Sequence, residues 1–307
     1  MSGGTMRYGF VGLGNLGGHL AASLLREGFA LAVNDLDRKT AEPLIAKGAR
    51  WAEGAAEVAA ECDAVVTCLP SPKAVDAVVA GKGGILEGAR RGLCWIDMST
   101  SDRAEVARLA ALAKDKGVAV LEAPVTGGVH RAAAGEITVL VGGEEALFAA
   151  HLPAFEAMGG LVLHMGPLGS ASAIKVITNM LAFVHLVAAG EALMLARRGG
   201  LDLGRAFEAI RASSGNSFVF ETEGQLILNG SYDVAFTMDL ACKDLGFAYE
   251  MGRELGVPLE LAGLVEQIFR RGRESYGGGA QSTQIVKLLE DALGTDLRAA
   301  GFPARLE

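Results

Sequence analysis

The chain has 307 residues, of which 50% are hydrophobic and only 6% are aromatic, and it carries a formal net charge of -8. This acidic balance argues against a protein that follows nucleic-acid phosphates, because that class presents a basic surface. The length exceeds that of one usual hydrophobic core and predicts about two domains. The scarcity of aromatic residues favours closely packed, alanine-rich helices over an all-β core.

The start of the chain and its most apolar stretch show no pattern typical of export or of membrane insertion. Residues 1–5 form a short polar start, so we expect a cytoplasmic protein. Residues 176–196 are the most apolar stretch, but they include Asn179, His185 and Glu191, which favours a buried helix over a membrane span. The cysteines form no Cys-x-x-Cys pair and have no histidines at metal-ligand spacing, so we predict reduced thiols and no metal site.

A glycine-rich turn directly follows a short apolar strand at residues 7–11. Its pattern is Gly-x-Gly-x-x-Gly: Gly12 permits the tight turn, Gly14 admits a pyrophosphate close to the backbone, and Gly17 lets the next helix pack on the strand. Unpaired N–H groups and the positive end of the helix dipole then face the phosphates. We therefore predict that a dinucleotide binds at Gly12, Leu13, Gly14, Asn15, Leu16 and Gly17.

The residues that follow supply the other parts of a dinucleotide-binding unit. A helical segment at 15–27 leads to a second apolar strand at 29–34, and Asp35 closes that strand 23 residues after Gly12. A carboxylate there accepts hydrogen bonds from both ribose hydroxyls and repels the 2′-phosphate of NADP, so NAD is the favoured cofactor. Arg38, three residues further on, makes some use of NADP possible. A turn that served only chain reversal would not need the strand, the helix and the acid together.

Apolar runs and helical stretches alternate through the rest of the first half of the chain. This alternation predicts a mostly parallel, doubly wound sheet with helices on both faces. The strands are expected at residues 64–69, 93–98 and 118–123, and the helices at 39–47, 55–61, 74–80 and 103–116.

Ligands of such sheets bind beyond the carboxyl ends of the strands. The residues that directly follow the predicted strands should therefore line one crevice together with the glycine turn. These are Leu69, Pro70, Ser99, Thr100 and the segment 124–128.

From residue 169 onward the sequence shows only helical patterns. Apolar residues recur at three- and four-residue steps through 170–198, which predicts one long helix linking two domains. The predicted fold class is α/β, with a Rossmann-type doubly wound sheet domain at 1–168 and an all-α domain at 169–307. Further helices are expected at 203–212, 218–228, 238–255, 259–273 and 282–293.

The sequence Glu-Ala-Pro-Val-Thr-Gly-Gly at 122–128 ends the strand at 118–123. A proline, a hydroxyl and two glycines give a tight bend that presents N–H groups and a hydroxyl, a combination that holds a carboxylate. Thr126, Gly127 and Gly128 are therefore candidates to bind a small carboxylate substrate. From these residues alone, an ordinary loop is an equally good interpretation.

Two lysines lie in apolar helical segments. Lys175 precedes Asn179 by one turn, so both side chains share a face, where a lysine can exchange a proton with a substrate oxygen and an asparagine can orient it. The alternative is a snorkelling surface lysine beside a satisfied core asparagine. Lys243 lies between acids in a later helix, where pairing with Asp239 four residues earlier is the alternative to a functional role.

Taken together, five motifs resemble the β-hydroxyacid dehydrogenase family, which includes 3-hydroxyisobutyrate dehydrogenase. They occur in the family's order and span essentially residues 6–293. They are the glycine turn, Asp-Met-Ser-Thr at 97–100, the segment 122–128, the glycine-rich entry to the helix with Lys175 and Asn179, and Leu-Ala-Cys-Lys-Asp-Leu-Gly at 240–246.

The resemblance implies a role for each candidate residue. Lys175 matches the catalytic lysine that acts as general acid or base, and Asn179 matches a substrate-binding asparagine. Thr126, Gly127 and Gly128 match the carboxylate-binding turn. Cofactor-binding positions implied in the same way are Thr100 and Lys243 near the nicotinamide, and Asp35, which is typical of members that use NAD.

Some positions depart from the family pattern. Thr178 and Glu122 replace an asparagine and an aspartate, and Gln281 replaces an aspartate beside Ser282. Less typical are His130 and Arg131, which come just after the substrate turn. Arg131 either pairs with a second acidic group on a dicarboxylate or sulfonate substrate, or is a solvated surface arginine.

The motifs predict an NAD(P)-dependent oxidoreductase that transfers a hydride between nicotinamide and a small 3-hydroxy acid or its semialdehyde. Substrates of this class resemble 3-hydroxyisobutyrate, glycerate with tartronate semialdehyde, or 4-hydroxybutyrate with succinic semialdehyde. The apolar C-terminal helices and the resemblance favour a homodimer or homotetramer, with no nucleic-acid or membrane partner. The alternatives are a decarboxylating 6-phosphogluconate-type enzyme, an imine reductase-like enzyme and a non-catalytic dinucleotide-binding module.

Overall fold

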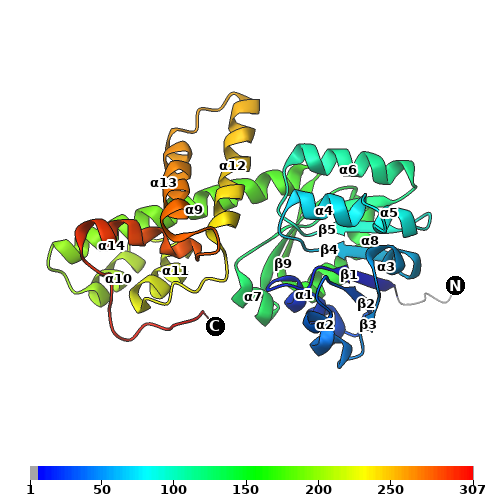
Figure 1. Cartoon of the computed structure of the whole chain (residues 1–307), viewed down its shortest axis with the longest axis horizontal. Helices are drawn as coiled ribbons and strands as arrows, with labels where there is room; N and C mark the ends of the chain where they lie inside the picture. Colours follow the sequence, from blue (N-terminus) through cyan, green and yellow to red (C-terminus); the bar gives the residue numbers. More distant parts are fainter. Residues whose placement is uncertain (1–5, 307) are drawn as a thin grey trace. The chain divides into compact units, whose positions relative to one another are not determined.

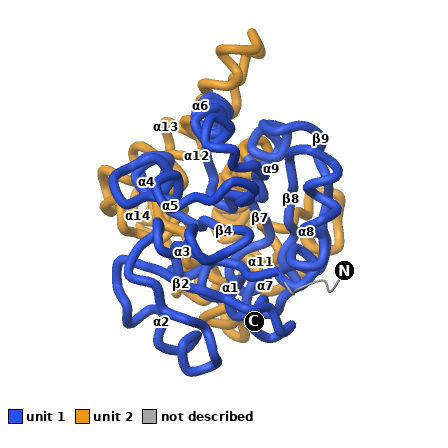
Figure 2. The backbone as a smooth tube through the Cα atoms, turned by 90° about the vertical axis from the view of Figure 1, so that its right-hand side faces the viewer, with its two compact units in different colours: residues 1–175 blue, residues 176–307 orange. Residues whose placement is uncertain are grey.

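The chain forms two compact units in the computed structural model, which describes residues 6–306. Unit 1 comprises residues 1–175 and unit 2 comprises residues 176–307 (Figure 2). The chain passes from one to the other within a single helix, α9 (Ser170–Arg198), at the position predicted for the long linking helix. The predicted domain boundary follows residue 168, whereas the compact units divide after Lys175, in the second turn of α9.

Unit 1 is built on a sheet in which six strands run parallel in the order β3-β2-β1-β4-β5-β6. Every strand predicted for residues 7–123 is present, so the prediction of a doubly wound, mostly parallel sheet is confirmed. The strands are β1 (Arg7–Val11), β2 (Ala30–Asn34), β3 (Arg50–Trp51), β4 (Ala64–Thr67), β5 (Cys94–Asp97) and β6 (Ala119–Glu122).

The last residues of neighbouring strands form one row across the sheet. Asn34 pairs with Val11, Val11 with Thr67, Thr67 with Asp97, and Asp97 with Glu122. All the loops that follow these strands therefore leave the sheet at the same edge. This edge carries four polar side chains, three of which, Thr67, Asp97 and Glu122, are buried.

Three further strands extend the sheet beyond β6, and the sequence patterns did not predict them. β8 (Ile137–Gly142) pairs antiparallel with β6 and with the short β7 (Val125–Thr126), and β9 (Gly159–Gly166) pairs parallel with β8. The predicted bend at 124–128 is thus partly wrong, because Val125 and Thr126 are extended. Both are β-branched and pair with Val139 and Thr138, as such residues favour.

Alternating side chains of the strands fill two separate cores, one on each face of the sheet. Phe10 of β1 and Val66 of β4 pack with α1, α2 and α8, whereas Val65 packs with α3 to α6. Figure 1 shows α4 and α6 on one side of the sheet and α1 and α2 on the other. The helices are α1 (Gly17–Arg26), α2 (Arg38–Ile45), α3 (Ala55–Glu61), α4 (Pro72–Val79), α5 (Ile85–Gly88), α6 (Arg103–Asp115), α7 (Val129–Ala134) and α8 (Glu145–Met158).

The first of these helices begins later than predicted. α1 starts at Gly17, so Asn15 and Leu16 belong to the turn that precedes it. A side chain at Gly17 would overlap the carbonyl oxygen of Gly12, which explains why the helix can start this close to the strand only at a glycine.

Unit 2 is helical, as predicted, and its elements form one core. The predicted helix at 282–293 is divided: it begins as the 3₁₀ segment η1, whose first residues are held by a capping box between Gln281 and Gln284. The elements after α9 are α10 (Leu203–Arg211), α11 (Phe218–Asn229), α12 (Met238–Leu255), α13 (Glu260–Tyr276), η1 (Ser282–Val286) and α14 (Lys287–Leu293).

By length and composition α9 is able to cross a membrane, since its most apolar window has a mean hydropathy of 1.6. Of that window, 39% is buried. Phe183, Leu186 and Leu193 from this helix belong to the core of unit 2. These contacts are typical of a core helix of a folded protein.

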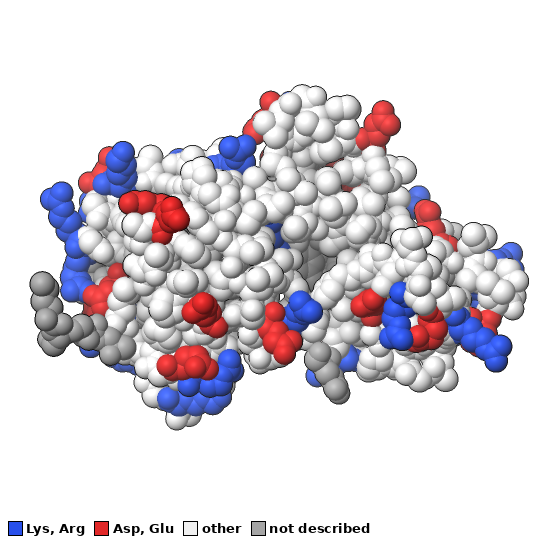
Figure 3. All heavy atoms as spheres, turned by 180° about the vertical axis from the view of Figure 1, so that it is seen from behind, with Lys and Arg blue, Asp and Glu red and all other residues white. Residues whose placement is uncertain are grey.

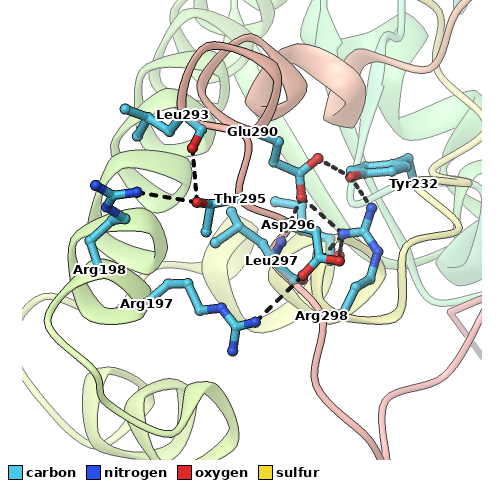
Figure 4. Close-up of polar contacts among 10 residues, drawn as sticks. Arg197, Arg198, Tyr232, Glu290, Leu293, Thr295, Asp296, Leu297 and Arg298 are labelled. Carbon is cyan, nitrogen blue, oxygen red and sulfur yellow. Dashed lines mark hydrogen bonds and ion pairs between the residues drawn. The ribbon is translucent and has the colours of Figure 1, made fainter.

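A buried carboxylate fixes the chain that follows α14 (Figure 4). Glu290 is 7% exposed and accepts hydrogen bonds from Tyr232 Oη, from the Leu297 N–H (2.7 Å) and from Arg298 Nη1 (2.9 Å). Arg298 Nη2 also donates to Tyr232 Oη at 2.6 Å. Three donors from two segments of the chain thus bind one carboxylate. Burial also raises the pKa of the Tyr232 phenol above its usual value.

We predict that Glu290→Ala lowers the free energy of unfolding by about 1–3 kcal/mol, because it leaves the buried Tyr232 hydroxyl and the Leu297 N–H without their acceptor. The loss should be smaller than for a fully buried ion pair because the Arg298 side chain is 36% exposed. Urea unfolding measures the change. Asp296→Ala is the control: its carboxylate lies 3.7 Å from Arg197 with both side chains exposed, so the expected change is within about 0.5 kcal/mol. Equal effects of the two substitutions would contradict the assignment.

Candidate active site

Backbone contacts set the shape of the glycine turn after β1. Gly12 has a φ of 95°, in the left-handed region, and its N–H donates to the Asn34 carbonyl at 3.1 Å. A Cβ at Gly12 would overlap the carbonyl oxygen of Cys68 and lie 2.9 Å from Leu69 Cδ2. Gly12 is therefore required by both conformation and close packing, as Gly17 is by packing.

Gly14 differs from these two glycines. A Cβ at this position would have no protein atom within 4 Å, and its φ is outside the left-handed region. The neighbouring N-cap residue of α1, Leu16, makes no side-chain capping bond. An open position beside the N-terminus of α1, where the positive end of the helix dipole lies, fits a pyrophosphate, which is the role predicted for this turn.

Asp35 lies at the end of β2 and contacts the glycine turn directly. Its Oδ2 accepts a hydrogen bond from the Leu13 N–H at 2.6 Å, and its Oδ1 accepts one from the Asp37 N–H at 3.1 Å. Each carboxylate oxygen retains capacity for a second donor. Asp35 thus holds the turn in shape and also keeps acceptors for ribose hydroxyls.

A chain of hydrogen bonds connects the loops that follow β4 and β5. The Leu69 N–H donates to Ser99 Oγ at 2.9 Å, and the Ser99 N–H donates to Asp97 Oδ1 at 3.1 Å. Thr67 Oγ1 donates to the same carboxylate oxygen at 2.8 Å. Burial raises the pKa of Asp97 above its usual range, although the hydrogen bonds act in the opposite direction. This network fixes the backbone just before Pro70 and Thr100, two of the predicted cofactor contacts.

The predicted carboxylate-binding turn follows β6 and contains β7. Thr126 is half-buried and ends β7, and Gly127 and Gly128 have φ values of 124° and 90°. The Arg131 side chain lies beside Gly127, with its Cδ 3.0 Å from the position of a Cβ there. Burial, followed by the Arg131 charge, lowers the pKa of His130 and so favours a neutral imidazole next to this turn.

Lys175 and Asn179 are both buried, with exposures of 8% and 9%, although they lie on a helix that has exposed apolar residues. In unit 1, Lys175 is in the second turn of α9. In unit 2, Asn179 Nδ2 donates to Asp244 Oδ2 at 2.6 Å. Burying a lysine carries a large desolvation cost. A buried lysine is therefore more typical of a functional residue than of a surface residue that snorkels to solvent.

Lys243 shares the carboxylate that holds Asn179. Its Nζ donates to Asp244 Oδ1 at 2.6 Å, and Asp244 is only 1% exposed. Asp239, the partner that the alternative interpretation gave to Lys243, forms an ion pair with Arg273. Asp244 thus joins two residues that were predicted separately, one for substrate and one for cofactor.

Sequence reasoning placed Ser99 at the crevice only because it follows a strand, and it assigned no role to Asp244 or to the carboxylate of Glu122, yet each makes specific buried contacts. The only sign of these three residues in the sequence was that each is a polar residue inside an apolar segment. Among residues 6–306, no group of three or more His, Cys, Asp and Glu side chains is arranged to hold a metal ion.

The strand order and the glycine turn define a dinucleotide-binding protein with a second, helical unit. Residues 7–166 match the family described as the NAD-binding domain of 6-phosphogluconate dehydrogenase. Residues 169–289 match the family described as NAD-binding of NADP-dependent 3-hydroxyisobutyrate dehydrogenase. The chain therefore belongs to the β-hydroxyacid dehydrogenase family of the 3-hydroxyisobutyrate dehydrogenase type, and it is an NAD(P)-dependent oxidoreductase that acts on CH–OH donors.

Similarity to individual proteins extends over nearly the whole chain. It is 34% identical over 294 residues to 2-(hydroxymethyl)glutarate dehydrogenase of Eubacterium barkeri, which covers 95% of this chain and 98% of the relative. A crystal structure of 3-hydroxyisobutyrate dehydrogenase from Salmonella typhimurium aligns with a TM-score of 0.85 at 32% identity, covering 92% of this chain and 99% of the other. The Mycobacterium tuberculosis 3-hydroxyisobutyrate dehydrogenase with L-serine aligns with a TM-score of 0.83 at 29% identity, covering 93% and 99%.

We predict that Gly14→Ala weakens cofactor binding without unfolding the protein. The new methyl group meets no protein atom, so the free energy of unfolding should change by less than about 0.5 kcal/mol, whereas the Kd of NADH should rise at least about tenfold. Fluorescence titration and urea unfolding give the two values. Gly17→Ala is the contrasting variant, expected to lose stability because its methyl group overlaps the Gly12 carbonyl. Unchanged NADH affinity in Gly14→Ala would refute the assignment of this space to the pyrophosphate.

Proposed function

We propose that this enzyme interconverts a small 3-hydroxy acid and its semialdehyde, with Lys175 as the general acid and base. The observation that supports this best is the burial of Lys175, at 8% exposure, in the second turn of the helix that follows unit 1's sheet. Family membership supports the reaction class, and the role of this lysine is our inference from its chemistry and position.

The bound nicotinamide would accept or supply the hydride, which is the difficult part of the reaction. The chain's own task is to position the substrate and to move one proton. In the oxidative direction Lys175 Nζ takes the proton from the substrate hydroxyl oxygen as hydride leaves the carbon, and in the reductive direction it returns a proton to the aldehyde oxygen.

Substrate positioning is assigned to the turn at 126–128 and to Asn179. Thr126, with the backbone N–H groups of Gly127 and Gly128, would hold the carboxylate. Asn179 is itself fixed by Asp244, so its amide approaches a substrate oxygen in one orientation.

The second acidic group of a dicarboxylate substrate has a candidate partner in Arg131. Its side chain lies against Gly127, which is one of the residues assigned to the first carboxylate. The relative named for 2-(hydroxymethyl)glutarate acts on a compound with two carboxylates. Dicarboxylate 3-hydroxy acids therefore belong in any substrate panel, beside 3-hydroxyisobutyrate, glycerate and 4-hydroxybutyrate.

The preferred cofactor is proposed to be NAD. A carboxylate at Asp35 favours free ribose hydroxyls and disfavours a 2′-phosphate, while Arg38, with its side chain 65% exposed, keeps some NADP use open. The turn from Gly12 to Gly17 would hold the pyrophosphate. Leu69, Pro70, Thr100 and Lys243 are the residues assigned to the nicotinamide half.

We also propose a homodimer or homotetramer that works in the cytoplasm. Unit 2 exposes large apolar side chains, among them Leu181, Leu195, Leu261 and Leu264, at 45% to 77%, and a second subunit would cover such surface. On the face in Figure 3, basic and acidic side chains are interspersed. That distribution supports the expectation that nucleic acid and anionic membranes are not partners.

Two other functions on the same fold are separated from this proposal by Lys175. A non-catalytic dinucleotide-binding module has no use for a buried lysine, and an imine reductase-like enzyme is expected to lack it. If either function were correct, the protein would not turn over hydroxy acids and semialdehydes, or its turnover would not depend on Lys175.

We predict that Lys175→Ala lowers kcat by about 10²–10⁴-fold, because the proton has no donor or acceptor at the reacting oxygen. The variant should bind NADH with unchanged affinity, since the lysine is assigned no cofactor contact. A panel of 3-hydroxy acids and semialdehydes, assayed by nicotinamide absorbance, measures turnover. Wild-type kcat in the variant would exclude Lys175 as acid and base, and silence of the wild type across the panel with intact NADH binding would favour the binding module.

We predict that Asp35→Asn raises the ratio of kcat/KM with NADP to kcat/KM with NAD by about tenfold or more, which corresponds to about 1.4 kcal/mol. The substitution removes the charge that repels a 2′-phosphate, while the amide oxygen still accepts the Leu13 N–H. Asp37→Asn, two residues further on, is the matched charge control. A ratio that stays the same in Asp35→Asn, or that rises equally in both variants, would contradict the role assigned to Asp35.

A further inference from the structure

The Glu122 side chain connects the sheet to the start of α9. This residue ends β6, is 1% exposed, and lies four positions before Thr126. Its Oε1 accepts hydrogen bonds from the N–H groups of Gly169 (2.7 Å) and Ala171 (2.8 Å), and its Oε2 accepts one from Ser172 Oγ. One carboxylate therefore caps the N-terminus of a helix whose first residues follow it by about fifty positions.

The contacts of this cap fall directly beneath Lys175. Residues three and four apart on a helix are neighbours on one side, so Ser172 and Ala171 both lie one turn before Lys175 on its face. The axial rise from Ser172 to Lys175 is about 4.5 Å. Any rotation or shift of the first turn of α9 is thus passed to Lys175 with little loss.

The surroundings of Glu122 hold the carboxylate in one place. Gly142 of β8 pairs with Glu122, and a Cβ at Gly142 would overlap Oε1 and lie 2.9 Å from Cγ. Asp97 pairs with Glu122 in the next strand, and burial, followed by a smaller contribution from the charge of Glu122, raises the Asp97 pKa.

We propose that Glu122 is a positioning residue that sets the place of Lys175 relative to the carboxylate-binding turn. It belongs to the strand that leads into that turn, and its side chain holds the helix that carries the lysine. This inference rests on the proposed function of Lys175 as acid and base. A displacement of about 1 Å at a reacting group is enough to lower a rate about 10²-fold.

The test is the single-turnover rate constant for hydride transfer, measured by stopped flow with NADH-loaded enzyme in excess over the semialdehyde that the wild type turns over best. The rate constant reports the geometry of the folded enzyme, whereas a loss of folded protein lowers only the amplitude. Glu122→Ala should lower the rate constant about 10²-fold with little change in the Kd of NADH.

Glu122→Gln is the matched variant that separates position from charge. Its amide oxygen still accepts the two N–H groups, and its NH₂ group donates to Ser172 Oγ, so the rate constant should stay within about fivefold of the wild type. Leu44→Ala, in the core between α2 and the sheet, controls for lost stability and should leave the rate constant unchanged. If Glu122→Ala does not fold, Gly142→Ala displaces the carboxylate from its other side and should slow the reaction in the same way.

A double-substitution cycle decides whether Glu122 acts through Lys175. In the Lys175→Ala background, adding Glu122→Ala should cost no further rate, because the displaced group is already absent. A wild-type rate constant in Glu122→Ala, equal losses in the Ala and Gln variants, or effects that multiply with Lys175→Ala would each overturn the inference. Wild-type turnover in Lys175→Ala alone would instead overturn the proposed function, whichever result Glu122 gives.

Discussion

The parallel register of β1, β4, β5 and β6 is the constraint on which the rest of unit 1 depends. Because Val11, Thr67, Asp97 and Glu122 lie in one row, each following loop starts at the same level of the sheet. The sheet alone therefore brings together the glycine turn, the two hydroxyl-bearing loops and the carboxylate turn. No contact among the side chains of these loops is needed for that. Their spacing comes from the distance between hydrogen-bonded strands, about 4.8 Å.

Buried polar groups at this row are tolerated because each one holds a neighbouring loop or helix. Asp97 accepts from Thr67 and from the Ser99 backbone, and Ser99 in turn holds Leu69. Burying a carboxylate without partners costs several kcal/mol, so a polar row of this kind persists only where donors converge on it. In unit 2 the buried Asp244 likewise accepts hydrogen bonds from Asn179 and Lys243. Both units thus use a buried acid to fix residues assigned to the site.

The alternation of strands and helices was readable from the sequence because local periodicity determines it, and α9 and α12 were predicted with the bounds that the structure gives. β9 escaped detection since its outward residues, Leu161 and Leu163, are apolar and exposed, which removes the usual alternation. The pairing of Asp244 with Asn179 spans 65 residues, and the bonds of Glu122 span 47 to 50. Contacts over such separations depend on tertiary packing and leave no local pattern.

The close fit of Glu122 against Gly142 also limits how this chain can change. A side chain at residue 142 would overlap the carboxylate, so an alanine at that position displaces the Glu122 side chain for as long as residue 122 is a glutamate. A shorter acid at residue 122 would have to come first for residue 142 to accept a methyl group without that displacement. The two positions, on adjacent antiparallel strands, form a pair in which the order of substitutions decides whether the intermediate sequence retains a functional fold.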